Sequence, residues 1–237
     1  MYERTSSWEA PIIMSGSVKR NYQNELDELL CELYGADAVK AGAVFDNAVK
    51  KSLLLHACCA PCSSYVTEYL HGFFDITILF YNPNITEEAE YIKRKEELKR
   101  YLSEVSYGSE IKMIDADYEP GVYLENVKGL EKEPERGARC RVCFYLRLLK
   151  TAVMASGLGV DYFCTTLSIS PHKDADLLMS IGEEMSSEYG IAYLPSDFKK
   201  RGGYQRSIEL SREYGLYRQD FCGCIFSKNQ KNLKISE

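Results

Sequence analysis

The 237-residue chain lacks the long apolar run that a membrane-spanning helix requires. It has no stretch of about 18 or more apolar residues, so we expect no membrane span. Residues 1–16 also lack the basic-then-apolar order of a secretion signal, and no repeat or low-complexity tract is present. These absences predict a cytoplasmic globular protein whose cysteine thiols stay reduced.

A glycine-rich phosphate loop is missing as well. An ATP-dependent tRNA enzyme on an α/β fold needs such a loop, for example SGGxDS, to cradle the pyrophosphate. Residues 57–63, ACCAPCS, contain no glycine. This argues against an ATP-dependent or sulfur-transfer enzyme, which we keep as an alternative. The net charge of -6 means that any nucleic-acid contact has to be local.

Cysteine, in contrast, is abundant and clustered. Seven of the nine cysteines fall into Cys58-Cys59-x-x-Cys62, Cys140-x-x-Cys143 and Cys222-x-Cys224. Thiolates at such spacings can converge on a metal, although a fold has to gather clusters so far apart in the chain. Structural disulfides are disfavoured, since the count is odd and no secretion signal is seen. One structural zinc with spare cysteines, or a thioredoxin-like dithiol, remains an alternative.

The number of clustered thiols favours two metal centres. Four thiols hold an iron–sulfur cubane, and three remain for a second metal with an open position. We expect the adjacent side chains of Cys58 and Cys59 to diverge, which favours two neighbouring centres over one. Cys31 and Cys164 lie outside the clusters, and we expect both to be buried filler.

Strand-like apolar runs alternate with helical patterns after residue 50. This predicts an α/β fold, a mostly parallel five-stranded sheet with helices on both faces, Rossmann-like. We divide the chain into an N-terminal extension with one helix (1–50) and an α/β catalytic domain that carries the metal site (51–237). The five predicted strands are SLLLHACC, FDITILFYNPN, EIKMIDADY, DYFCTTLSIS and IAYLPSDF.

The loops after the predicted strands define a candidate site. In such sheets, ligands bind beyond the carboxyl ends of the strands. The first cysteine cluster follows the first strand, and the segment 170–174 follows the fourth. His172 on this rim is a candidate for proton transfer. His56, which precedes the first cluster on an apolar strand, is expected to be a core imidazole or a hydrogen-bond donor to a ligand.

Basic residues concentrate near these loops despite the acidic total. Glycines beside the charges permit close approach to phosphate, and Tyr204 can stack on a base, which predicts nucleic-acid contact. The run Lys93-Arg94-Lys95 is different, because we expect it on a solvated helix face. The candidate substrate contacts are Lys173, Lys199, Lys200, Arg201, Arg206 and Arg218.

Four segments in order resemble the epoxyqueuosine reductases of the QueH type: HACCAPCS (56–63), CRVCFYLRL (140–148), TTLSISPHKD (165–174) and FKKRGGYQRSIELSREYGLYRQDFCGC (198–224). The resemblance implies a tRNA-modifying oxidoreductase that reduces epoxyqueuosine to queuosine at the wobble position of tRNAs with GUN anticodons. This is the last step of queuosine biosynthesis, carried out here without cobalamin. The resemblance also implies a fold like that of PP-loop ATPases (HUP-like), with cysteines in place of the phosphate loop.

The same resemblance implies a [4Fe–4S] cluster beside a mononuclear iron, with the seven clustered cysteines as ligands. Cys140 and Cys143 are our candidates for the cubane. His172 and Tyr204 are candidate catalytic residues that supply protons as the oxygen leaves. An external electron donor of the ferredoxin or flavodoxin type is implied. The alternative is a zinc-binding tRNA-binding protein, or a sulfur-transfer protein, on the same fold.

Overall fold

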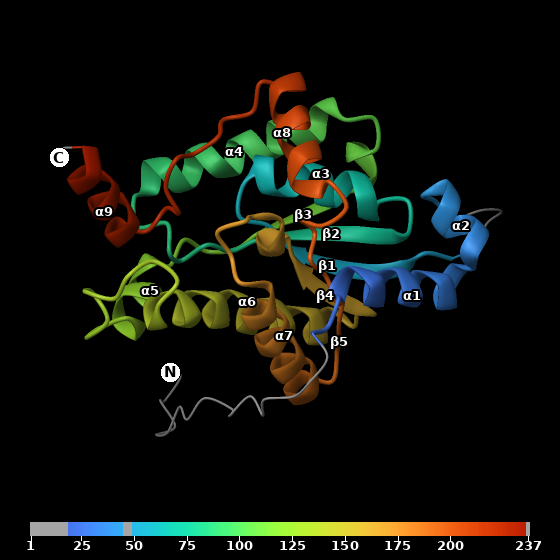
Figure 1. The fold of residues 1–237 in the computed structure, drawn as a ribbon, viewed down its shortest axis with the longest axis horizontal. Helices are drawn as coiled ribbons and strands as arrows, with labels where there is room; N and C mark the ends of the chain where they lie inside the picture. Colours follow the sequence, from blue (N-terminus) through green and yellow to red (C-terminus); the bar gives the residue numbers. More distant parts are fainter. Residues whose placement is uncertain (1–18, 45–48, 236–237) are drawn as a thin grey trace.

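The structure is a computed structural model that describes residues 19–44 and 49–235. Its centre is a sheet of five parallel strands in the order β3-β2-β1-β4-β5 (Figure 1). The predicted α/β fold with a parallel five-stranded sheet is therefore confirmed. The strands are β1 (Lys51–His56), β2 (Phe74–Phe80), β3 (Lys112–Asp115), β4 (Tyr162–Thr165) and β5 (Ala192–Tyr193).

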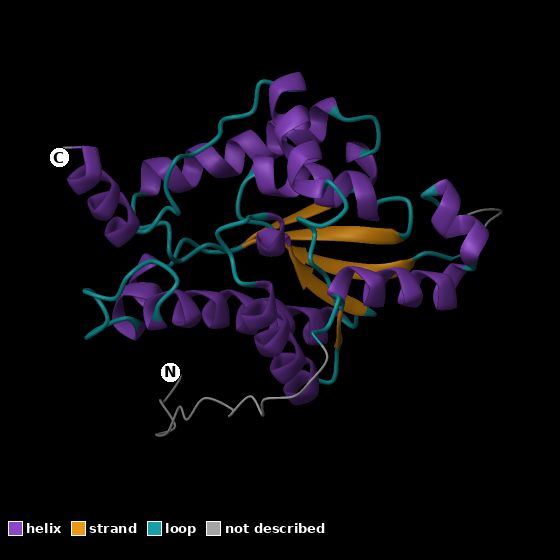
Figure 2. Ribbon diagram, viewed as in Figure 1, coloured by secondary structure: helices purple, strands orange, loops and turns teal. Residues whose placement is uncertain are grey.

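Helices cover both faces of the sheet, so β1 is buried throughout its apolar run from Leu53 to Leu55. Figure 2 shows the sheet between two helical layers, with α3, α4 and α8 on one side and α6 and α7 on the other. The helices are α1 (Tyr22–Tyr34), α2 (Ala36–Ala41), α3 (Ala60–Leu70), α4 (Glu88–Glu104), α5 (Pro120–Asn126), α6 (Ala138–Leu158), α7 (Ala175–Tyr189), α8 (Gly203–Glu213) and α9 (Ile225–Ile235), with short 3-10 helices η1 (Gly108–Glu110) and η2 (Thr166–Ile169).

The strand order creates a crevice between β1 and β4. The chain begins at β1, moves outward to β2 and β3, and then returns to place β4 on the other side of β1. At such a switch point the loops after the two central strands diverge, which leaves room for a ligand. The first cysteine cluster follows β1 and the segment with His172 follows β4, so both lie at this crevice.

All five strands are shorter than the predicted segments, and β4 and β5 show why most clearly. β4 ends at Thr165, whose hydroxyl accepts a hydrogen bond from the Leu167 amide and starts η2. β5 has two residues, although Leu194 N still donates to Phe163 O (2.9 Å). Pro195 follows and has no N–H to extend the ladder.

The N-terminal segment packs on the same core. Leu26 and Leu30 of α1 are fully buried in one cluster with residues of β1 and α3. Cys31 is exposed, so the prediction that it is buried is wrong, because one residue beyond Leu30 the helix has turned by about 100°. The domain boundary at residue 50 stays a prediction.

Two further predictions concern a secretion signal and a membrane-spanning helix. Residues 1–16, in which a secretion signal was sought, lie outside the described residues. Among residues 19–44 and 49–235, no helix is both long enough and apolar enough to cross a membrane.

Candidate metal centre

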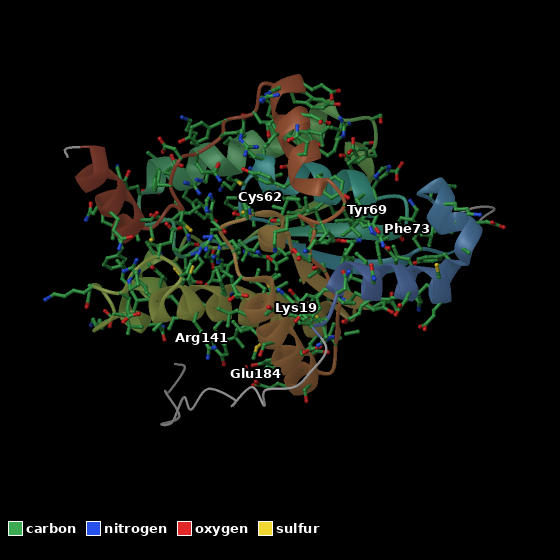
Figure 3. The ribbon with its side chains drawn as sticks, viewed as in Figure 1. Lys19, Cys62, Tyr69, Phe73, Arg141 and Glu184 are labelled. Atoms are coloured by element: carbon green, nitrogen blue, oxygen red, sulfur yellow. The ribbon has the colours of Figure 1, made fainter. Side chains whose placement is uncertain are left out.

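The first cysteine cluster forms a compact thiol triad at the start of α3. The Sγ atoms of Cys58, Cys59 and Cys62 lie within 4.8 Å of one another, and those of Cys58 and Cys59 are 3.7 Å apart. Figure 3 labels Cys62, which lies in the first turn of α3. Two sulfurs on a tetrahedral ion with 2.3 Å bonds lie about 3.8 Å apart, so this triad suits one metal ion. The expected divergence of Cys58 and Cys59 is therefore wrong. Cys59 is the residue that precedes α3, and its backbone is extended (φ -176°, ψ 164°).

Hydrogen bonds single out one thiol of this triad. The thiols of Cys58 and Cys62 both bond to Cys59, and this holds the pKa of Cys59 well below its usual value. The side-chain amide of Gln219 also donates to Cys59 Sγ (2.9 Å). Cys59 is thus the thiol prepared to lose its proton first. Gln219 was missed in the sequence, because no pattern marks an amide that donates to a sulfur.

Cys143, Cys222 and Cys224 form a second group, since they interact electrostatically with one another. Cys143 and Cys224 are buried together against Tyr123 and Val127. Cys140 lies one helical turn from Cys143 on α6, and its Sγ accepts from the Arg136 amide (3.3 Å). Among the described residues, the triad is the group that meets the mutual 4.8 Å limit, so this second group is more open.

Two buried cations face the second group. The Nη2 of Arg147 donates to Cys143 Sγ and the Nζ of Lys173 to Cys222 Sγ, both at 3.1 Å. Burial raises the pKa of Cys143 to about 12 although Arg147 opposes it. At Cys222, burial also acts to raise the pKa, but the charges of Lys173 and Arg147 outweigh it and lower the pKa.

A cavity of about 980 Å³ opens beside the thiols. It brings together residues from the loops after β1, β2 and β4 and from the segment that follows α8. The predicted site residues that line it are Cys58, Cys62, Cys222, His172, Lys173, Tyr204 and Arg218. Cys59, Cys140, Cys143 and Cys224 do not line it.

The predicted basic residues after β5 do not form one surface at the cavity, because three of them are held in ion pairs. Lys199 pairs with Asp197 (2.5 Å), Arg206 pairs with Glu68 (2.6 Å), and Arg201 pairs with Asp27 of α1. These three residues do not line the cavity, whereas Arg218 does and is exposed. Lys200 is exposed outside the lining. Arg201 is exposed as well, but its charge is compensated by Asp27, so Arg218 and Lys200 are the exposed candidates outside these three ion pairs.

Arg94 is buried, so its predicted place on a solvated helix face is wrong. It is 2% exposed and donates to Glu90 (2.7 Å) and to the carbonyl oxygens of Phe221 and Cys222. It lies three residues after Tyr91 and four before Leu98, on the buried stripe of α4. That spacing was visible in the sequence. Arg94 fastens the loop of the third cysteine cluster to α4.

A buried, uncharged histidine ends β1 two residues before the triad begins. His56 is fully buried, with Nδ1 2.8 Å from Thr165 Oγ1 and Nε2 3.0 Å from Tyr81 O. Burial lowers the pKa of His56 to about 4, so the ring is uncharged at neutral pH. The prediction of a core imidazole is confirmed, as is the predicted burial of Cys164.

Comparison with known proteins identifies the family. The model of the family "Epoxyqueuosine reductase QueH" matches residues 53–230. An epoxyqueuosine reductase QueH of Streptococcus pyogenes is 46% identical over 191 residues, which cover 80% of this chain and 75% of that protein. The Staphylococcus epidermidis relative is 40% identical (79% and 81% covered), and the Thermotoga maritima relative is 34% identical (78% and 95% covered). The predicted resemblance is confirmed, and the chain belongs to the epoxyqueuosine reductase QueH family.

Proposed function

We propose that the protein reduces epoxyqueuosine to queuosine in tRNA, with a [4Fe–4S] cluster and a mononuclear iron held by its seven clustered cysteines. The observation that carries this proposal is the convergence of the Cys58, Cys59 and Cys62 thiols beside a cavity of about 980 Å³. The reaction is the one that the relatives' names state. The protein would act in the cytoplasm, where thiols stay reduced.

The number and grouping of the cysteine ligands fit the two proposed iron centres. The triad offers three close thiols, which leaves one position on a tetrahedral ion open. The remaining four cysteines, Cys140, Cys143, Cys222 and Cys224, match the four thiolates of a cubane. When bound, these centres would supply electrophilic activation of an oxygen and one-electron transfer.

The protein side chains would bind the nucleoside and supply protons. Reduction of the epoxide breaks both C–O bonds and forms one C=C bond, and it consumes two electrons and two protons as the oxygen leaves as water. His172 and Tyr204 line the cavity and are the proposed proton donors. The electrons would come from a donor of the ferredoxin or flavodoxin type. Arg218 at the cavity and exposed Lys200 are the proposed phosphate contacts.

The test uses cells that lack every other epoxyqueuosine reductase. Nucleosides from their tRNA should contain epoxyqueuosine, and expression of this chain should convert it to queuosine. The Cys62→Ser variant should fail, whereas Cys164→Ser, which changes a buried cysteine outside the clusters, should succeed. Epoxyqueuosine that persists with the wild-type chain would contradict the proposal.

Metal analysis of the anaerobically purified protein tests the cofactors separately. We expect about five irons per chain, four in a cubane and one alone. A chain that contains zinc alone would favour the alternative, a zinc-stabilised RNA-binding protein. In that case Cys62→Ser should unfold the chain instead of leaving it folded and inactive.

A further inference from the structure

Arg147 places a buried positive charge between the two groups of thiols. It lies on α6, one turn after Cys143, and is 1% exposed. It donates to the carbonyl oxygen of Cys143 (3.2 Å) and to its Sγ (3.1 Å), and the Phe144 ring centroid lies 5.7 Å from the guanidinium carbon. No carboxylate pairs with it in the part of the chain that the structure describes.

The other buried arginines near the thiols are compensated differently. Arg94 has the carboxylate of Glu90 at 2.7 Å. Arg139 donates to the backbone carbonyl oxygens of Glu131 (2.9 Å) and Glu133 (2.7 Å) and holds that loop in place. Of these three, Arg147 is the one whose side chain bonds to a thiol.

A buried guanidinium needs an anion nearby, because removing a charge from water is costly unless it is paired. Arg147 interacts electrostatically with Cys143 and Cys222 of the second group and with Cys58 of the triad. It also lines the cavity together with Cys58, Cys62 and Cys222. The anion it would face is therefore the set of thiolates that forms when the cysteines of both groups bind metal.

We propose that Arg147 is a positioning residue that compensates the negative charge of both metal centres and thereby raises the reduction potential of the cluster. This inference rests on the proposed function. Reduction adds one electron to a centre that is already anionic, and a fixed cation within a few ångströms stabilises the reduced form more than the oxidised form. The low dielectric of the buried site strengthens this effect.

The first measurement is the midpoint potential of the reconstituted protein, followed by the electron paramagnetic resonance signal of the reduced cluster. At the wild-type midpoint, Arg147→Met should lower the ratio of reduced to oxidised cluster at least about tenfold, which is about 59 mV for a one-electron couple. Arg147→Lys keeps the charge and should recover most of the shift. Lys150→Met removes a charge from the same helix, where Lys150 covers the Tyr81 ring, and should leave the potential unchanged.

The second measurement compares thermal unfolding of loaded and metal-free protein. If Arg147 compensates the metal centres, Arg147→Met should reduce the stabilisation gained on loading, and the metal-free variant should be at least as stable as the metal-free wild type. A variant that loses its fold without metal, or that loads iron with an unchanged potential, would overturn the inference. A wild-type chain that takes up no iron would contradict the proposed function as well.

Discussion

The ammonium group of Lys173 lies 3.1 Å from the sulfur of Cys222, with its side chain 10% exposed. Burial acts to lower the pKa of this lysine, but the nearby Cys222 sulfur outweighs burial and raises it. Lys173 was predicted to contact the substrate. In the structure its ammonium group donates to a thiol and the residue also lines the cavity, so the substrate contact stays a prediction.

Lys173→Met should therefore weaken iron retention. Loss of the cation removes a hydrogen bond to Cys222 and the charge that stabilises its thiolate. Groups that orient metal ligands typically contribute at least about tenfold to metal affinity, so iron release to a chelator should be about tenfold faster. The control is Lys200→Met, an exposed lysine outside the cavity lining. Equal release rates in both variants would contradict this role.

Arg94→Met should be strongly destabilising. It leaves the Glu90 carboxylate (11% exposed) without its cationic partner, although the Tyr217 hydroxyl still donates to it (3.1 Å). It also frees the carbonyl oxygens of Phe221 and Cys222. Breaking one side of a buried pair costs about 3–5 kcal/mol in the free energy of unfolding. The double variant Glu90→Gln with Arg94→Met should recover part of this loss.

Urea denaturation measures both variants of this pair. Lys99→Met, on the exposed side of the same helix, serves as the control and should change stability by less than about 0.5 kcal/mol. A double variant no more stable than Arg94→Met alone would show that unpaired Glu90 is not the cause.

Asp161 should make stability depend on pH in the acid range. Its carboxylate accepts hydrogen bonds from Ser52 Oγ (2.7 Å), Ser52 N (2.8 Å) and Lys51 Nζ (2.9 Å), which lower its pKa from 3.8 to about 2. Because the pKa is lower in the folded state, the stabilisation is complete above about pH 4 and is lost as the pH falls towards 2.

Asp161→Asn should cost about 1 kcal/mol at pH 7, a modest value because the carboxylate is partly exposed. The gap between variant and wild type should shrink as the pH falls from 4 to 2. Urea unfolding of both proteins over this range measures the gap, and their difference cancels the effect of the other titrating groups. A gap that stays constant down to pH 2 would disprove the assignment.

Arg206 and Arg218 should differ in how much each contributes to the salt dependence of tRNA binding. Arg206 is engaged by Glu68, whereas Arg218 lines the cavity and donates to Ser211 Oγ (3.0 Å). Removing one phosphate contact reduces the salt dependence of binding by about one unit in the slope of log K against log salt. We expect this change for Arg218→Ala and not for Arg206→Ala. Equal slopes for both variants would return Arg206 to the candidate contacts.

The fold was predictable because its strands carry their own signal. The apolar run Leu53–Leu55 is typical of a central parallel strand, and the alternation with helices determines the fold class. The lengths of β4 and β5 were less accessible, because they depend on the Thr165 hydroxyl bond and on Pro195. The short helices α2 and α5 were not predicted, since their patterns are too brief to stand out. Helix α9 was also not predicted, although with 11 residues it is as long as α3 and α8.

The residues that form the site were easier to predict from the sequence than the partners that those residues contact. Cysteine spacing indicated metal ligands, and the strand order explains why the first cluster and His172 meet at one crevice. The partners of charged side chains were not accessible, because they depend on residues far away in the chain. Arg201 meets Asp27, Arg206 meets Glu68, and Lys173 meets Cys222. Arg94 is the exception, since its place on the buried stripe of α4 could have been recognised.

The separation of the thiols along the chain has a consequence for synthesis. The triad lies between residues 58 and 62, while the last thiol of the second group is Cys224, after α8. During translation the triad therefore leaves the ribosome long before its neighbours exist. The nascent chain then exposes the three thiols of the triad to any available metal ion. The full set of ligands can assemble only after residue 224 has emerged. Loading with the proposed iron centres would thus be a late event in the maturation of this protein.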